Sequence, residues 1–150
     1  MSNPNAPDRI QVAAADDHPA FLEGLVALLS LEDDIEIVAT AANGAEAIEA
    51  VRRHRPDILL LDLRMPGLDG LGALRRLSRV ESPTRIIVLT ASEDRLDYVQ
   101  AISDGAAGVA LKGEAVDRLA DCIRAVHGGQ IWLADGALPL PEEPAGAWTL

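Results

Sequence analysis

The sequence predicts an α/β protein built on a doubly wound, five-stranded parallel sheet with five helices. Five short apolar runs alternate with five longer segments of helical periodicity, the links between them are short, and three of the runs are apolar almost throughout. An apolar run without alternation is typical of a strand covered on both faces. Strand–helix units with short links favour right-handed crossovers between parallel strands.

The expected strands are the apolar runs themselves. In chain order they read IQVAAA, IEIVA, DILLLD, RIIVLT and GVALK, at residues 10–15, 35–39, 57–62, 85–90 and 108–112. The first helix is expected to begin near Pro19, which suits a first helical turn. The second is expected to begin at NGAE, where Asn43 and Glu46 have the spacing of a capping box.

The remaining three helices are expected from about Gly70, after Ser92, and from about Glu114 to Gly128-Gly129. Apolar residues recur at helical spacing in four of the five helices, and we expect these stripes to face the core. The stripes consist of Phe21, Leu22, Leu25, Leu28 and Leu29; of Leu71, Leu74 and Leu77; of Leu96, Val99 and Ile102; and of Val116, Leu119, Ile123 and Val126.

Length, charge and cysteine content narrow the class of protein. The 150 residues are enough for one domain with a full core, and 24 acidic against 13 basic side chains give a net charge of −11. This charge argues against nucleic-acid binding by this segment alone and favours basic partners or metal cations. The single cysteine, Cys122, excludes an internal disulfide and suits a reducing cytosol, and we expect it to be a small apolar residue on the last helix.

The N-terminal residues are not typical of a targeting segment. Residues 1–8 are polar and Pro-rich, so we expect a disordered lead rather than a secretion signal. No apolar run approaches the roughly 20 residues that cross a membrane. The sequence therefore predicts a cytoplasmic protein that does not contact a membrane.

Charged and polar residues end four of the five strands. Asp16 and Asp17 follow the first strand, Asp62 ends the third, Thr90 the fourth and Lys112 the fifth. In doubly wound sheets the ligand site lies outside the carboxyl ends of the strands, where the strand order reverses. We therefore expect these five side chains to gather at one site.

Three clustered carboxylates repel one another unless a cation joins them. Mg²⁺ suits such a site, because it takes one or two carboxylates together with waters and a phosphate oxygen. The cation would neutralise an attacking carboxylate and an incoming phosphoryl group together, so that an aspartate could act as a nucleophile. Lys112 would add a second positive charge, and Thr90 would offer a hydroxyl to a phosphoryl oxygen.

These residues resemble the receiver domain of two-component response regulators. The motifs are ADD at 15–17, LDLRMPGLDG at 61–70, LTAS at 89–92 and the lysine of LKGE at 111–114, and the resemblance covers residues 9–129. It implies the flavodoxin-like strand order 2-1-3-4-5. It also implies transfer of a phosphoryl group from a phosphohistidine of a sensor histidine kinase to an aspartate.

Position by position, the resemblance makes Asp62 the phosphoryl acceptor. It implies that Mg²⁺ is bound by Asp17, Asp62 and the backbone carbonyl of Arg64, with Asp16 acting through a water molecule. The protein would be a switch rather than an enzyme, although it would assist its own phosphorylation and dephosphorylation. Phosphorylation would be linked to formation of a homodimer.

Thr90 and Lys112 would contact the phosphoryl oxygens and transmit the signal. One position departs from the family. Three residues before the lysine the family usually has Tyr or Phe, whose ring moves inward on phosphorylation, and here the residue is Val109. How Val109 replaces this aromatic switch is left open by the sequence.

The motifs DDHP at 16–19, MPGLDGL at 65–71 and HGG at 127–129 resemble the subfamily with a C-terminal LuxR-type helix-turn-helix. Residues 130–150 include the Pro-rich PLPEEPAGA, and we expect a tail or linker towards a DNA-binding domain absent from this chain. The output would then be regulation of transcription. The competing hypothesis is a stand-alone receiver that acts through protein–protein interaction.

Other classes of protein stay open. A phosphohydrolase with an aspartate nucleophile would need a second acid two residues after Asp62, where the sequence has Arg64. A nucleotide-binding module would need glycine-rich turns after the first strand, where Asp16-Asp17 would repel a pyrophosphate. A receiver that works without phosphorylation is kept open by Val109. For His18, we favour the start of a helix over a phosphorelay histidine.

Overall fold

The computed structural model describes residues 8–64, 70–80 and 82–135, in which five strands alternate with five helices. The strands are β1 (Ile10–Ala15), β2 (Ile35–Ala41), β3 (Ile58–Asp62), β4 (Arg85–Thr90) and β5 (Gly108–Leu111). The helices are α1 (Pro19–Leu29), α2 (Gly44–His54), α3 (Gly70–Ser78), α4 (Arg95–Ser103) and α5 (Val116–His127). The strands form one parallel sheet in the order β2-β1-β3-β4-β5, so the predicted fold and strand order are confirmed.

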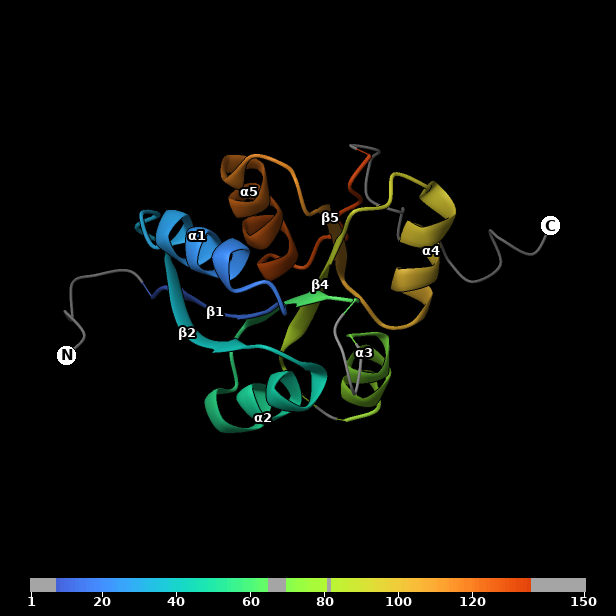
Figure 1. The fold of residues 1–150 in the computed structure, drawn as a ribbon, viewed down its shortest axis with the longest axis horizontal. Coiled ribbons are helices and arrows are strands. Elements are labelled where there is room, and N and C mark those ends of the chain that lie inside the picture. Colours follow the sequence, from blue (N-terminus) through green and yellow to red (C-terminus); the bar gives the residue numbers. More distant parts are fainter. Residues whose placement is uncertain (1–7, 65–69, 81, 136–150) are drawn as a thin grey trace.

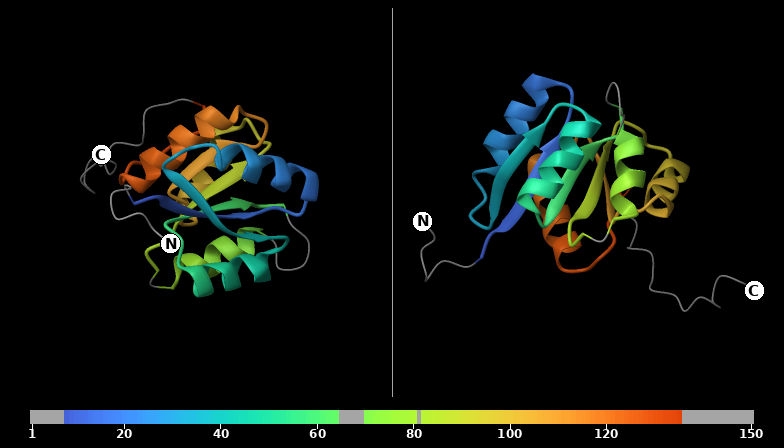
Figure 2. Two further views of the ribbon diagram at one scale, coloured as in Figure 1. Left: turned by 90° about the vertical axis from the view of Figure 1, so that its left-hand side faces the viewer. Right: turned by 90° about the horizontal axis from the view of Figure 1, so that it is seen from below.

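Helices cover both faces of the sheet, with α1 and α5 on one face and α2, α3 and α4 on the other (Figure 1). Figure 2 shows the sheet between these two layers. Each face has its own hydrophobic core, one containing Leu25 and Ile123, the other Val51 and Leu74. The central strand β3 is buried throughout because it is covered on both sides, which explains its uninterrupted ILLLD sequence.

Local sequence signals account for two of the helix starts. Pro19 is the first residue of α1, as expected. The backbone N–H of Glu46 donates to Oδ1 of Asn43 at 2.8 Å, so Asn43 caps α2. The Glu46 carboxylate reaches one residue further back than in the usual capping box and accepts from the N–H of Ala42 at 2.9 Å.

The expected core stripe of α4 is wrong for two of its three residues, since only Ile102 packs against the core. Leu96 and Val99 are 76% and 42% exposed, whereas Tyr98 and Ala101 are the buried residues of this helix. The Tyr98 hydroxyl donates to the carbonyl of Ser92 at 2.8 Å, so the large ring is buried with its polar group satisfied. On α1 the expectation for Leu28 is also wrong, because this residue is 49% exposed.

Residues beyond α5 continue to pack on the sheet. The N–H of Val109 in β5 donates to the carbonyl of Trp132 at 2.9 Å, and Leu133 and Ala134 are buried. The packed part of the chain therefore extends past Gly129, where we placed the end of the receiver by sequence. The expected disordered lead and most of the expected linker, at residues 1–7 and 136–150, lie outside the described residues.

Two further expectations concern Cys122 and the membrane. Cys122 is fully buried on α5, as expected, and burial raises the pKa of its thiol to about 12. None of the helices in the described ranges has the length and apolar character of a membrane span.

Candidate functional site

The carboxyl ends of β1, β3, β4 and β5 meet at one edge of the sheet, because all of these strands are parallel and adjacent. The chain goes outward from β1 to β2 and then returns to β3, so the strand order reverses between β1 and β3. Asp16 follows β1 and Asp62 ends β3 on either side of this reversal. Both carboxylates are buried, with residue exposures of 1% for Asp16 and 4% for Asp62.

An acidic cluster occupies this edge. Asp16, Asp17, His18 and Asp62 each present one potential ligand atom, and these atoms all lie within 4.8 Å of one another. The three acids therefore gather as the strand pattern predicted. Asp17 and Asp62 point into the same cluster and are close enough to share one ion.

Lys112, the only lysine of the sequence, is the cation of this cluster. Its Nζ lies 2.8 Å from Oδ2 of Asp16 and 3.1 Å from Oδ2 of Asp62. Burial alone would lower the pKa of Lys112, but the close contacts with Asp16 and Asp62 outweigh burial and raise it. The ammonium therefore stays charged and offsets part of the negative charge of the acids.

His18 also belongs to the cluster, which the sequence analysis missed. It does precede α1, as expected, but its side chain caps no helix N–H. Its Nδ1 lies 2.9 Å from Oδ1 of Asp16 and 3.0 Å from Oδ1 of Asp17. The same nitrogen is 3.0 Å from Nζ of Lys112. Its position directly after the two acids was the available signal.

Thr90 and Arg64 line an open cleft of about 450 Å³ beside Asp62 and Lys112. The backbone N–H of Arg64 donates to Oδ1 of Asp62 at 3.0 Å. Together with Lys112, this bond fixes both oxygens of the Asp62 carboxylate. Thr90 presents its hydroxyl at the end of β4, where Oγ1 accepts from the N–H of Ser92 at 3.0 Å. The cleft leaves space for a small group next to Asp62.

The start of α3 packs directly against the end of β3. A Cβ at Gly70 would lie 2.0 Å from the carbonyl oxygen of Asp62 and 2.4 Å from Cα of Leu63. Only glycine fits at this distance, so the backbone of α3 supports the strand end that carries Asp62. Residues 65–69, which include most of the MPGLDG motif, lie outside the described residues.

The donor set of the cluster suits a small, hard cation. Oδ2 of Asp16 and Oδ1 of Asp17 are buried and accept no hydrogen bond with good geometry from the described part of the protein. Buried carboxylate oxygens without donors are costly unless a cation approaches them. Lys112 approaches Asp16 as an ion pair, whereas Asp17 has only His18 beside it. Carboxylate oxygens next to an open cleft match the preference of Mg²⁺ for oxygen ligands and retained waters.

Comparison with protein families agrees with this geometry. Residues 12–124 match the family model of the response regulator receiver domain. The chain is 41% identical over 128 residues to the transcriptional regulatory protein NarL of Mycobacterium tuberculosis, a match that covers 83% of this chain and 59% of that protein. It is 37% identical over 125 residues to the oxygen regulatory protein NreC of Staphylococcus epidermidis, covering 83% of this chain and 57% of that protein.

A solved structure shows the same architecture. The signal receiver domain of the response regulator NarL from Mycobacterium tuberculosis superposes with a TM-score of 0.78 at 36% identity, over 83% of this chain and all of that one. The chain thus matches a whole receiver domain. It spans about three fifths of the length of the two longer relatives.

Proposed function

Because this chain belongs to the response regulator receiver domain family, we propose that it takes up a phosphoryl group on Asp62 and passes the resulting change to an output. One observation supports this most: Asp16, Asp17 and Asp62 form one cluster with the only lysine, beside an open cleft. We propose a sensor histidine kinase as the phosphoryl donor.

We assign the metal site to Asp17, Asp62 and the backbone carbonyl of Arg64, with Asp16 acting through a water molecule. Mg²⁺ bound there would offset the charge of Asp62 and of the incoming phosphoryl group. In support, Asp17 offers a buried oxygen that accepts no hydrogen bond from the described residues. The role of the Arg64 carbonyl rests on family resemblance, because the contact seen in the structure is made by its N–H.

In the transfer, an oxygen of Asp62 forms a bond to phosphorus while the bond between phosphorus and the donor imidazole breaks. The imidazole leaves with a proton from solvent, and the phosphoryl group stays on Asp62 as an acyl phosphate. The contacts of Asp62 with Arg64 N–H and with Lys112 hold its carboxylate at the wall of the cleft. Lys112 and the Thr90 hydroxyl would then contact the phosphoryl oxygens.

A switch fits the site better than a phosphohydrolase. The position two residues after Asp62 holds Arg64, which provides no carboxylate to act as general base for fast hydrolysis. We therefore expect modest self-dephosphorylation. A homodimer on phosphorylation, a cytoplasmic location and a transcriptional output through a separate DNA-binding domain complete the proposal. The transcriptional output is supported by the similarity to NarL, a longer relative that is a transcriptional regulatory protein.

A route from the site to the surface exists without an aromatic residue at position 109. Val109 is buried in β5, and a valine has no aromatic ring that could move between a buried and an exposed position. Ser92 instead connects Thr90 to α4, because its N–H donates to Thr90 Oγ1 while its carbonyl accepts from the Tyr98 hydroxyl. A Thr90 hydroxyl drawn to a phosphoryl oxygen would weaken its bond with Ser92, and α4 would respond through Tyr98.

The experiment is incubation with acetyl phosphate and Mg²⁺, followed by intact-mass measurement. We expect a gain of about 80 Da, the mass of one phosphoryl group on an aspartate. Asp62→Asn should abolish the gain, and chelation of Mg²⁺ should suppress it. Asp57→Asn is the matched control, because Asp57 directly precedes β3, at the end opposite to Asp62, and accepts from the N–H of Gln11. No gain in the unmodified protein would favour a receiver that acts without phosphorylation.

A further inference from the structure

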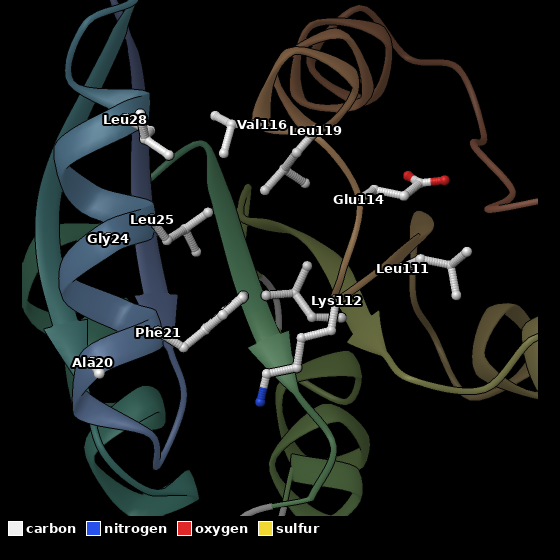
Figure 3. A pocket seen from close by; sticks show the side chains of 11 residues that line it. Ala20, Phe21, Gly24, Leu25, Leu28, Leu111, Lys112, Glu114, Val116 and Leu119 are labelled. Carbon is white, nitrogen blue, oxygen red and sulfur yellow. The ribbon is translucent and has the colours of Figure 1, made fainter.

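Phe21 lies over the cation of the site. The Lys112 ammonium is 4.8 Å from the centroid of the Phe21 ring, within the range of a cation–π interaction. Figure 3 shows the two side chains on facing sides of the cleft between α1 and the end of β5. Phe21 is partly buried at this cleft edge, although the sequence pattern placed it simply in the core stripe of α1.

We propose that Phe21 is a positioning residue for phosphotransfer, whose ring holds the Lys112 ammonium over Asp62. This inference rests on the proposed function, because it assigns Phe21 a part in the uptake of the phosphoryl group by Asp62. Phe21 does not touch the reacting atoms. It acts through Lys112.

The contacts of Lys112 show why it needs a support of this kind. Its polar partners are Asp16 at 2.8 Å, Asp62 at 3.1 Å and Nδ1 of His18 at 3.0 Å. On another side, the lysine borders an apolar cleft of about 230 Å³ that is also lined by Phe21, Leu25 and Leu119. The flexible stem of a lysine could turn toward this space. The ring of Phe21 lies 4.8 Å from the ammonium and attracts it by the negative potential of its face.

The ring also suits the exchange of partners that phosphotransfer requires. Asp62 must be free to bond to phosphorus, and Lys112 must then turn from the carboxylate to a phosphoryl oxygen. Hydrogen bonds to Asp62 depend on direction, and this movement breaks them. The ring attracts an ammonium at any position over its face within about 6 Å of the centroid, so Phe21 can hold the ammonium before and after the transfer.

The sequence allows a test that changes only the electrons of this ring. Phe21 is the only phenylalanine, so replacing every phenylalanine with a fluorinated analogue alters this position alone. Phenylalanine, 4-fluoro-, 3,5-difluoro- and 3,4,5-trifluorophenylalanine have similar shapes but progressively weaker negative potential on the ring face. The measurement is the rate of phosphorylation by acetyl phosphate with Mg²⁺, together with the melting temperature of each form.

We expect the rate to fall with each added fluorine, to a total loss on the order of threefold to tenfold, while the melting temperature stays nearly constant. Phe21→Leu should lose at least as much rate as the trifluoro form, and Phe21→Tyr should restore it. Equal rates in all four forms would overturn the proposal and leave Phe21 a packing residue. A rate that follows the melting temperature rather than the fluorine count would also overturn it.

A second measurement separates the contact from the reaction. The single ¹⁹F resonance of the 4-fluorophenylalanine protein should shift in Lys112→Met. It should not shift in Arg52→Met, because the Arg52 side chain is exposed on α2. If the ¹⁹F chemical shift were the same in Lys112→Met as in the unmodified protein, the proposal would be overturned even if phosphorylation is normal. A shifted resonance without phosphoryl uptake in any form would contradict the proposed function, and the assigned role of Phe21 in transfer would fall with it.

Discussion

At the scale of residues, Lys112 sets the charge balance of the site. Asp16 and Asp62 are both almost completely buried, and the ammonium lies about 3 Å from each. Without Lys112, each of these two buried carboxylates would keep a hydrogen bond from a backbone N–H but lose its lysine partner, which is costly for a buried charge. The proposed Mg²⁺ would be a second cation, bound on the side of Asp17.

Lys112→Met should therefore destabilise the protein strongly in the absence of divalent ions. We expect a loss of about 3 kcal/mol in the free energy of unfolding, the order of magnitude for breaking a buried ion pair. Addition of Mg²⁺ should recover part of the loss, because the ion binds the folded state and replaces the missing charge. Urea unfolding with chelator and with Mg²⁺ measures both quantities.

The control for this substitution is Arg52→Met. Arg52 is 74% exposed and pairs with Glu49 at 3.8 Å, so its removal should change stability by less than about 0.5 kcal/mol, with or without Mg²⁺. Equal losses in the two variants, or no response of Lys112→Met to Mg²⁺, would contradict the charge balance proposed for the site.

At the scale of elements, the junction of β3 and α3 fixes where Asp62 stands. Gly70→Ala should cost about 1–3 kcal/mol, because the new methyl group collides with the backbone of Asp62 and Leu63 rather than with a flexible side chain. It should also lower phosphoryl uptake, since the strand end must move. Thermal or urea unfolding and the intact-mass assay report the two effects.

Gly24→Ala provides the comparison. Gly24 lies inside α1 with nothing within 4 Å of an added Cβ, so alanine should stabilise the protein by up to about 1 kcal/mol through its helix propensity. If both glycine variants behaved alike, the close approach of α3 to β3 would not be a constraint on the fold.

Individual elements also show what the sequence could and could not predict. The run ILLLD predicted β3 because burial on both faces leaves a continuous apolar pattern, and NGAE predicted the start of α2 because its cap is formed locally. The buried face of α4 was not predictable in this way. The helix has nine residues, and apolar side chains occur around it, so tertiary packing of Tyr98 decided which side was buried.

At the scale of the whole molecule, the candidate site follows from topology. Parallel strands bring their carboxyl ends to one edge, so acids distant in sequence were expected to meet there, and Asp16, Asp17 and Asp62 do. The contacts of His18 and Phe21 with Lys112 were not foreseen. They depend on the rotation of α1 against the end of β5 and on side-chain rotamers, neither of which an apolar pattern specifies.

A charged network joins α5 to the turn between α1 and β2. Arg124 of α5 contacts Asp34 at 2.7 Å and Glu32 at 2.5 Å in the turn before β2. The hydrogen bond from Arg124 lowers the pKa of Asp34 below its ordinary value of 3.8, against the opposing effect of burial. A lowered pKa means that this stabilisation is present above pH 3.8 and is lost as the pH falls through the lower, folded-state pKa.

Asp34→Asn should therefore reduce stability at pH 7 by about 1 kcal/mol or less, since both partners are partly exposed and screened by solvent. The difference in the free energy of unfolding between this variant and the unmodified protein should disappear as the pH falls below 3.8. Asp121→Asn removes the ion pair of Arg124 with Asp121, which is 3.2 Å long and more exposed. It should therefore reduce the free energy of unfolding by less than Asp34→Asn does. A difference that is independent of pH would rule out the ion pair as its cause.

The most direct test of the central claim is a crystal structure with Mg²⁺ and beryllofluoride, which imitates a bound phosphoryl group. We predict beryllium on a carboxylate oxygen of Asp62, with fluorides contacting Lys112 and Thr90, and the metal ion shared by Asp17 and Asp62. A metal ion bound away from Asp17 and Asp62, or beryllofluoride attached to another residue, would contradict it.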